Sequence, residues 1–255
     1  MRIHDVFAEA QVLIGEMRQA AEAAGKEDEV VLWRCVREYR FFIMRTGQDY
    51  RFEDYLQGLD PARGSYVGAP FTARADPTSR QAMALLLRTL EDTVEPARKR
   101  LVLVLVEMLN FLAASGQYDA FADYLENAPT GIPWAIAWFA TRAEADTWLS
   151  SLQEPPSSAY ILVGDDYYSV WYSREDDERK FSRDDAMRPV LEELANGGVP
   201  AAVAAVNTRE EAREWLKSHP AAPLAVVTIA GEHHLAAYHK RFNRHTLHSL
   251  VPAGT

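Results

Sequence analysis

The sequence contains a single cysteine, Cys35, in 255 residues. One cysteine excludes a disulfide within the chain and a four-cysteine zinc site, and such usage is typical of a reducing compartment. The opening segment MRIHDVFAEAQ carries carboxylates where a signal peptide needs an apolar stretch. The most apolar segment, residues 101–114, is shorter than the roughly 20 residues of a membrane span and contains Glu107 and Asn110. We therefore expect a cytoplasmic protein with no membrane partner.

Short motifs that mark common enzyme classes are also missing. The sequence has neither a G-x-x-x-x-G-K-[ST] nor a G-x-G-x-x-G phosphate-binding turn, and it has no G-x-S-x-G nucleophile turn. These absences disfavour nucleotide binding by the usual loops and α/β-hydrolase chemistry. We predict a protein that is not an enzyme and holds no cofactor.

Positive charge is in deficit, because 27 basic residues stand against 37 acidic ones and the net charge is −10. Nucleic acids and anionic membranes attract clustered cations, so neither is the expected main partner. A basic partner fits this charge better. With 48% hydrophobic residues, the chain has the composition of a soluble globular protein of one or two domains.

The C-terminal half contains an internal repeat at an offset of 67 residues, which aligns 133–164 with 200–231. The shared core is T-R-x-E-A-x-x-W-L. Thr141 and Thr208 are predicted helix N-caps, and Glu144 and Glu211 stand three residues later, as in a capping box. Alanine, tryptophan and leucine then recur at the spacing of one buried helix face.

Each predicted helix lies between strand-like stretches, so the repeat is a β-α-β-β unit. The two copies are assigned to 132–173 and 199–240, with turns at Gly164 and Gly231. A further helix between them is predicted to be capped at Ser182 and to end at 196–198. Together these elements predict one α+β domain over 131–255, in which two half-sheets pair or pack face to face.

The N-terminal half shows a weaker duplication at an offset of 69 residues, which aligns 40–57 with 109–126. A pair of long helices is predicted in each copy, followed by a short helix ending in Asp-Tyr-Leu, and the segment 58–77 is interpreted as a loop. The helices are predicted at 5–24, 28–45, 79–93 (capped near Thr78) and 96–114. The fold class is therefore α+β, with a helical bundle of two duplicated hairpins over 1–130 before the duplicated β-α-β-β domain, and a boundary at 127–131.

Six of the seven histidines lie in the last 37 residues. Imidazole is a common metal ligand, which raises the alternative of a metal-dependent or small-molecule enzyme that uses this segment. Adjacent His233 and His234 on a strand point to opposite faces, however, and His245 and His248, which could share a helical face, lack a nearby carboxylate or cysteine in a known ligand spacing. We therefore predict no metal site. The six are His219, His233, His234, His239, His245 and His248.

Two other groups have competing chemical and structural interpretations. Cys35 lies between Arg34 and Arg37, which would favour a thiolate nucleophile, but a cysteine in an amphipathic helix is more often a small core residue. The acidic runs at 165–166, 175–178 and 184–185 lack the alternation and fixed glycine of a calcium loop. A solvated charged face is the expectation for them.

The two copies of the C-terminal repeat differ in charge. Residues 131–199 hold 6 basic and 13 acidic side chains, whereas 200–255 hold 6 basic and 4 acidic ones. Acidic and aromatic residues concentrate in the turn and third strand of the first copy, a composition that suits a surface binding a basic protein. Packing between the half-sheets would also explain the aromatic residues. The predicted partner-binding residues are Asp165, Asp166, Tyr167, Tyr168, Trp171 and Tyr172.

The segments TREEAREWL and AVVTIAGEHHLAAYH, and the chain in general, resemble immunity-type proteins of bacterial polymorphic toxin systems. This resemblance implies a small acidic cytoplasmic protein that lacks catalytic motifs and is built from duplicated α/β units. The function predicted first is thus a non-enzymatic module that occludes a basic protein partner, as an immunity or inhibitor protein does. A structural subunit of a larger assembly is a further alternative, because helical repeats can extend between protomers.

Overall fold

A computed structural model describes residues 2–60, 64–219 and 222–250. The chain divides into two compact units, Met1–Ala122 and Asp123–Thr255, which we call the helical unit and the sheet unit. The division falls inside helix α7, a few residues before the boundary chosen from the sequence. The predicted α+β class, with helices first and a duplicated β-containing part second, is confirmed.

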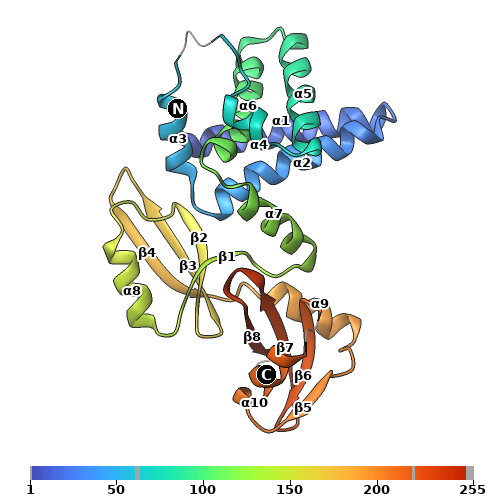
Figure 1. Ribbon diagram of the computed structural model, residues 1–255, viewed down its shortest axis with the longest axis vertical. Coiled ribbons are helices and arrows are strands. Elements are labelled where there is room, and N and C mark those ends of the chain that lie inside the picture. Colours follow the sequence, from blue (N-terminus) through green and yellow to red (C-terminus); the bar gives the residue numbers. More distant parts are fainter. Residues whose placement is uncertain (1, 61–63, 220–221, 251–255) are drawn as a thin grey trace. The chain divides into compact units, whose positions relative to one another are not determined.

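Two antiparallel hairpins, each followed by a shorter helix, form the framework of the helical unit (Figure 1). The predicted long helices and both short helices are present. The elements are α1 (Ile3–Ala23), α2 (Glu27–Arg45), α3 (Asp49–Gln57), α4 (Ala69–Arg74), α5 (Pro77–Asp92), α6 (Pro96–Ala114) and α7 (Tyr118–Asn127).

The segment 58–77 differs from its prediction as a loop, because it contains the short helix α4. Phe71 of this helix is buried, and its burial stabilises the helix. A short helix held by one buried aromatic residue in a proline-rich segment leaves no periodic pattern in the sequence. Residues 61–63 of the segment lie outside the described residues. The cap of α5 is Asp76 rather than a residue near Thr78, since the Asp76 carboxylate accepts from the backbone N–H groups of Thr78 and Ser79.

The duplication at offset 69 brings equivalent residues face to face. The side-chain amides of Gln48 and Gln117 exchange two hydrogen bonds, each 2.7 Å long. Each amide nitrogen also donates to the hydroxyl two residues earlier, on Thr46 at 2.6 Å and on Ser115 at 2.7 Å. Reciprocal contacts between equivalent residues are the signature of a two-fold relation. The two hairpins therefore meet about a local two-fold axis.

Helix α6 accounts for the most apolar part of the sequence. Its two internal polar side chains are buried and bonded, since Asn110 donates to Glu107 at 3.2 Å and Tyr55 donates to the same carboxylate at 3.2 Å. Among the described residues no single helix is long and apolar enough to span a membrane. Pro96–Ala114 and Tyr118–Thr130 meet that test only when joined, and they are bent by 111° at the break between them.

Two four-stranded sheets of the same topology form the sheet unit, which we call sheet A and sheet B. In each sheet the first two strands are parallel and the others antiparallel. Sheet A and its surroundings comprise η1 (Ala128–Thr130), β1 (Ala135–Phe139), α8 (Arg142–Ser151), β2 (Ser158–Val163), β3 (Asp166–Ser173), β4 (Glu178–Asp184) and α9 (Arg188–Gly197). Sheet B comprises β5 (Ala204–Val206), α10 (Arg209–Ser218), β6 (Leu224–Ile229), β7 (Glu232–His239), η2 (Lys240–Phe242) and β8 (Arg244–Ser249).

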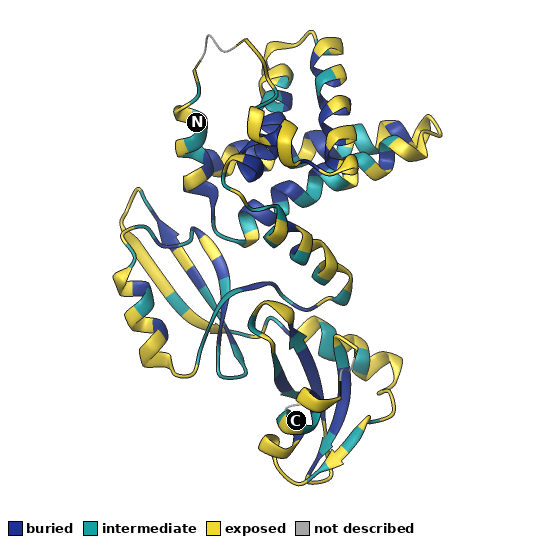
Figure 2. Cartoon of the chain, in the orientation of Figure 1, coloured by how far each residue is buried: buried dark blue, intermediate teal, exposed yellow. Residues whose placement is uncertain are grey.

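Each repeat is β-α-β-β-β rather than the predicted β-α-β-β. The added strands are β4, which includes the end of the acidic run at 175–178, and β8, which carries His245 and His248. Strand β4 is a sheet edge with most residues exposed, whereas β6 and β7 are largely buried (Figure 2). An edge strand exposed on both faces loses the apolar alternation by which strands are found in sequences.

The helix predicted between the repeats is present but begins later. Ser182, its predicted cap, lies in β4, and α9 begins at Arg188. The backbone N–H of Arg188 donates to the Asp185 carbonyl at 2.8 Å, and no described side chain caps the helix. The Ser182 and Asp185 spacing that resembled a cap spans the end of a strand. Gly198, with φ of 94°, follows the helix and permits the chain to turn.

The shared Thr-Arg-x-Glu segment has the same role in both repeats. Thr141 and Thr208 cap their helices by accepting from the backbone N–H groups of Glu144 and Glu211, as predicted. Both glutamates also accept a backbone N–H from the residue before the cap, at 2.9 Å and 2.8 Å. These bonds satisfy N–H groups that would otherwise lack partners at the start of each helix.

The arginine of the Thr-Arg-x-Glu segment also has the same role in both repeats, which explains why it is identical in the two copies. Arg142 donates to the Phe181 carbonyl of β4 at 3.2 Å, and Arg209 donates to the Leu247 carbonyl of β8 at 3.4 Å. Both carbonyls belong to edge strands, whose outer polar groups have no neighbouring strand. The repeated arginine therefore covers the exposed edge of its own sheet.

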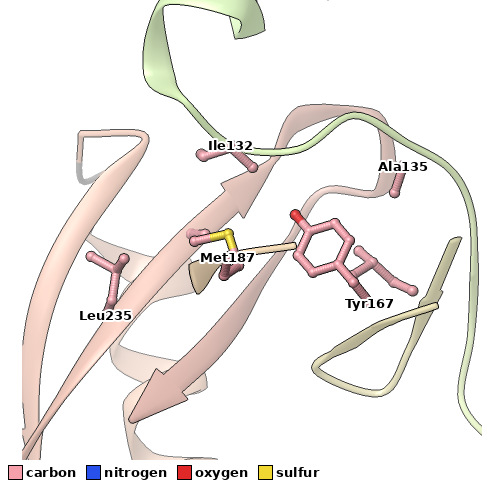
Figure 3. Close-up of a cluster of buried hydrophobic side chains, with 7 residues drawn as sticks. Ile132, Ala135, Tyr167, Met187 and Leu235 are labelled. Carbon is pink, nitrogen blue, oxygen red and sulfur yellow. The ribbon is translucent and has the colours of Figure 1, made fainter. Parts of the chain in front are cut away.

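The helix-free faces of the two sheets pack against each other, which is the second of the two arrangements that the sequence left open. A buried cluster joins Tyr167 of sheet A with Leu235 of sheet B, and Ile132 and Met187 fill the space around them (Figure 3). Helices α8 and α10 each pack with separate clusters on the other face of their own sheet. Apolar residues of α9 and its start complete this packing, since Met187 belongs to the inter-sheet cluster and Val190, Leu191 and Leu194 pack against it.

Candidate functional site

A groove of about 1260 Å³ lies between the two repeats of the sheet unit, and we call it the inter-repeat groove. Apolar side chains from both repeats contribute to its lining, including Tyr167, Met187, Leu191 and Leu247. Sites for drug-sized ligands usually measure about 300–1,000 Å³. The size of this groove therefore suits a segment of polypeptide better than a single small molecule.

Charged side chains from the first repeat and α9 form the rim of the groove. Asp166 pairs with Arg183 at 2.7 Å, and Asp185 pairs with Arg188 at 2.8 Å. All four side chains are largely exposed, so each pair contributes little to stability and can separate at low cost. Each of these ion pairs contributes no net charge to the rim.

Two further carboxylates on the rim, Asp184 and Glu192, have no ion-pair partner in the described part of the chain. Asp184 ends strand β4, and Glu192 lies in the second turn of α9. Because the arginines of the rim are paired with other carboxylates, these two residues give the groove a net negative charge. Unpaired carboxylates beside an apolar floor favour a cationic ligand.

Asp165 connects the two repeats at one end of the groove. It lies in the turn before β3, and its carboxylate accepts from Arg209 at 2.9 Å and from Arg213 at 2.7 Å, both on α10 of the second repeat. The Asp165 side chain is 11% exposed, so this three-residue ion pair is mostly withdrawn from water. The second carboxylate oxygen is buried without a hydrogen bond to the described residues.

Replacing Asp165 with asparagine is expected to lower the free energy of unfolding by about 1–3 kcal/mol, because two arginines would lose their shared counter-ion in a partly buried site. Asp166→Asn is the matched control, and its exposed pair predicts a loss below about 1 kcal/mol. Urea unfolding followed by tryptophan fluorescence measures both. Equal losses in the two variants would show that Asp165 does not hold the repeats together.

The residues predicted to form an acidic, aromatic surface do not share one face. Tyr167 and Tyr172 are buried, at 2% and 6% exposure, so neither belongs to a surface. Tyr168 packs on Phe181 with ring centroids 4.9 Å apart, on the side of the sheet that faces α8. Trp171 is 37% exposed and lies beside the edge strand β4. Alternation along strand β3 sends its successive residues to opposite faces.

The structure nevertheless brings part of the predicted set to the inter-repeat groove. Asp165, Asp166 and Tyr167 line it, at the turn and start of β3. Asp184 and Glu192 were not among the predicted residues. In the sequence, Asp184 belongs to the acidic run 184–185 and Glu192 stands beside Glu193. The fold brings both to a groove that residues of β8 also line.

The C-terminal histidines lie on strands, with His219 directly after α10 as the exception. His245 and His248 cannot share a helical face, as the sequence allowed, because both belong to β8 and their odd spacing places them on opposite faces. His233 and His234 do lie on opposite faces of β7, where His233 is exposed and His234 is buried. No group of three metal-ligating side chains forms among the described residues.

Two of these histidines form a hydrogen-bonded chain on the inner face of sheet B. Nε2 of His239 lies 3.0 Å from the Thr246 hydroxyl, and Nε2 of His248 lies 2.9 Å from the same hydroxyl. Tyr167 packs against both rings, with centroid distances of 5.9 Å and 6.1 Å. Burial lowers the pKa of His239 to about 3 and that of His248 to about 4, so both rings are neutral at physiological pH.

Cys35 is not suited to nucleophilic chemistry. Burial raises the pKa of its thiol to about 12, and the nearby carboxylates of Asp76 and Glu38 act in the same direction. Only a thiolate is strongly nucleophilic. The interpretation of Cys35 as a helix packing residue therefore stands over the chemical one.

The fold and groove define a class of structure: an α+β chain with a duplicated helical unit and a duplicated β-α-β-β-β sheet unit. Comparisons with protein-family models, with curated protein sequences and with solved structures found no match to this chain.

Proposed function

We propose that the protein is a non-enzymatic binding protein whose inter-repeat groove takes up a basic segment of a partner protein. The observation that carries this proposal is the combination of an apolar floor with two rim carboxylates, Asp184 and Glu192, that lack ion-pair partners among the described residues. A lysine or arginine of the partner supplies the missing counter-charge. Apolar side chains next to it bury area against Leu191 and Leu250, which line the groove and are partly exposed.

Charge over the whole chain supports the same partner. The net charge of −10 attracts a basic protein over a distance and raises the association rate, while the groove provides the short-range contacts. The rim pairs Asp166 with Arg183 and Asp185 with Arg188 can open at low cost, which lets the carboxylates turn toward the partner.

We propose that the protein acts as an immunity or inhibitor protein through this binding. Occluding the basic active surface of a toxin requires no catalytic residue in the inhibitor, only steric block and charge complementarity. The resemblance of the repeat segments to immunity-type proteins supports this form, and the inter-repeat groove is the site that we propose for it.

A basic heptapeptide in which lysine alternates with leucine and serine is a suitable probe, together with a counterpart that has glutamate in place of lysine. Titration of the labelled protein by NMR is expected to shift backbone signals around Asp184, Glu192 and Leu250, which line the groove. The acidic peptide is expected to cause no such shifts. Raising the salt concentration should weaken binding of the basic peptide, because exposed charges are screened.

Shifts from the basic peptide that fall outside the groove, or that do not change with salt, would contradict the proposed site. A partner encoded beside this chain would be tested in the same way. Its groove-localised, salt-dependent binding is expected, together with loss of the partner's activity on binding.

A further inference from the structure

A second concavity in the sheet unit, of about 210 Å³, is separate from the inter-repeat groove, and we call it the Trp134 cavity. The end of α7, the segment leading into β1, and the turn η2 surround it. Its apolar walls include Pro133, Trp134 and Phe242. The volume is below the about 300–1,000 Å³ of sites for drug-sized ligands, so the cavity suits a smaller molecule.

One cation of this cavity is available to a ligand. Lys240 is occupied, since its ammonium group contacts Asp123 at 2.7 Å and Glu126 at 2.8 Å. Arg241, the next residue, has only the longer-range attraction of Asp123, and partial burial lowers the pKa of its guanidinium. A guanidinium can bind a carboxylate in a bidentate manner, and Arg241 is exposed to an incoming ligand. The ligand chemistry is therefore a small monocarboxylate with an apolar or aromatic body.

His239 adds a polar group to the wall of the same cavity. Its side chain is 5% exposed, and Nε2 is bonded to Thr246, whereas Nδ1 has no hydrogen bond to the described residues. At the other end of the hydrogen-bonded chain, His248 lines the inter-repeat groove, and its Nδ1 likewise has no bond to the described residues. The chain of three residues thus runs from the cavity to the groove.

The hydrogen bonds that join His239, Thr246 and His248 can be arranged in two ways. A hydroxyl donates one hydrogen bond, so Thr246 can donate to only one imidazole and must accept from the other. A neutral imidazole carries one proton. If His239 donates from Nε2, its Nδ1 is an acceptor toward the cavity, and His248 then carries its proton on Nδ1, toward the groove. In the second state each of these assignments is reversed.

In either state the cavity and the groove therefore face imidazole nitrogens of opposite kind: one Nδ1 accepts a hydrogen bond and the other donates one. A ligand that donates a hydrogen bond to His239 stabilises the first state and presents an N–H from His248 at the groove. A ligand that only accepts stabilises the second state. The exchange is a proton relay. On going from the first state to the second, Nδ1 of His239 takes a proton from the cavity, the Nε2 proton of His239 passes to Thr246, and the hydroxyl proton passes to Nε2 of His248. The Nδ1 proton of His248 then leaves to water in the groove, so the total number of protons on the three residues is unchanged.

We propose that the Trp134 cavity is a binding site for a small aromatic carboxylate that also carries a hydroxyl group, and that the His239, Thr246 and His248 chain reports its hydrogen-bonding character to the groove. The carboxylate binds Arg241, the aromatic ring packs on Trp134 and Phe242, and the hydroxyl donates to Nδ1 of His239. This site does not depend on the identity of the partner bound in the groove.

Three probes test the site in the full chain: 3-hydroxybenzoate, 4-hydroxybenzoate and benzoate. Saturable binding is expected for all three by NMR titration, with signal changes around Trp134 and Phe242. Arg241→Gln is expected to weaken binding at least about tenfold. Arg100→Gln removes the same charge from an exposed position of the helical unit and is expected to leave binding unchanged. No saturation below about 10 mM of any probe would overturn the proposal.

The NMR chemical shifts of the ring nitrogens of His239 and His248 test whether the hydrogen-bonded chain of three residues links the two sites. A hydroxybenzoate is expected to move the proton of His248 onto Nδ1, whereas benzoate should bind without this change. In Thr246→Val the hydroxybenzoate should still bind, but the His248 signals should no longer respond. Identical His248 shifts with benzoate and hydroxybenzoate, or a preserved response in Thr246→Val, would contradict the relay while leaving the groove proposal intact.

Discussion

Replacing Tyr167 with alanine is expected to lower the free energy of unfolding of the sheet unit by about 3–5 kcal/mol. The ring is 2% exposed and lies in the cluster between the sheets, where it contacts both His239 and His248. Alanine would leave a cavity at the place where the two repeats meet. Of the six tryptophans only Trp33 lies outside the sheet unit, so urea unfolding followed by fluorescence reports mainly on this unit.

Two controls separate packing from the hydrogen bond of Tyr167. Its hydroxyl donates to the Pro133 carbonyl at 3.1 Å, and Tyr167→Phe removes only this bond, with an expected loss of about 1 kcal/mol. Trp171→Ala, on the same strand but 37% exposed, is expected to cost far less than Tyr167→Ala. If Tyr167→Ala cost no more than the Trp171 variant, the two sheets would not be held together by this cluster.

Acidification from pH 7 to about 4.5 is expected to destabilise the sheet unit by about 5 kcal/mol through His239 and His248. Unfolded histidine has a pKa near 6.5, whereas burial lowers the folded values to about 3 and about 4. The unfolded chain therefore binds protons first as the pH falls. The contribution is complete above pH 6.5 and is lost progressively below it.

The charged groups around the two imidazole rings leave the direction of both pKa shifts unchanged. For His239, burial acts first, and the neighbouring His248, His245 and Arg244 also lower the pKa. For His248, burial acts first, Asp165 and Asp166 oppose it, and Arg209 supports it. The net pKa is lowered in both cases, so protonation opposes folding.

The double variant His239→Gln/His248→Gln is the direct test of this acid effect. It is expected to be less stable at pH 7 but to lose much less stability between pH 7 and 4.5 than the unaltered protein. His219→Gln, at an exposed position, should retain the full pH dependence. A double variant with an unchanged slope would assign the acid sensitivity to other groups.

Local signals in the sequence predicted much of the fold because they act over a few residues. The Thr141 and Thr208 caps and the helices after them follow from side chains that bond within one turn. Strand β4 was missed because an edge strand exposed on both faces needs no apolar pattern, and its Ser182 imitated a helix cap. The two repeats were found by aligning the sequence with itself, but the alignment did not extend to the last strand of each unit.

The candidate site was only partly predictable, for a non-local reason. Asp165 and Asp166 stood out by composition, but whether a carboxylate is free depends on arginines far along the chain, such as Arg209. Of the carboxylates that line the groove, Asp184 and Glu192 are the ones without an ion pair to the described residues, and no motif distinguishes them. Pairing of charges is a property of the folded arrangement, so the sequence indicated the sign of the partner and not the residues that bind it.

The central claim, that the inter-repeat groove binds a basic segment through its unpaired carboxylates, is tested most directly by the affinity of the basic heptapeptide for two variants of equal net charge. Asp184→Asn/Glu192→Gln is expected to weaken binding about tenfold. Glu9→Gln/Glu91→Gln removes two exposed carboxylates from the helical unit and is expected to change the affinity less than about twofold. Equal weakening in both variants would contradict the account, because binding would then depend on overall charge and not on the groove.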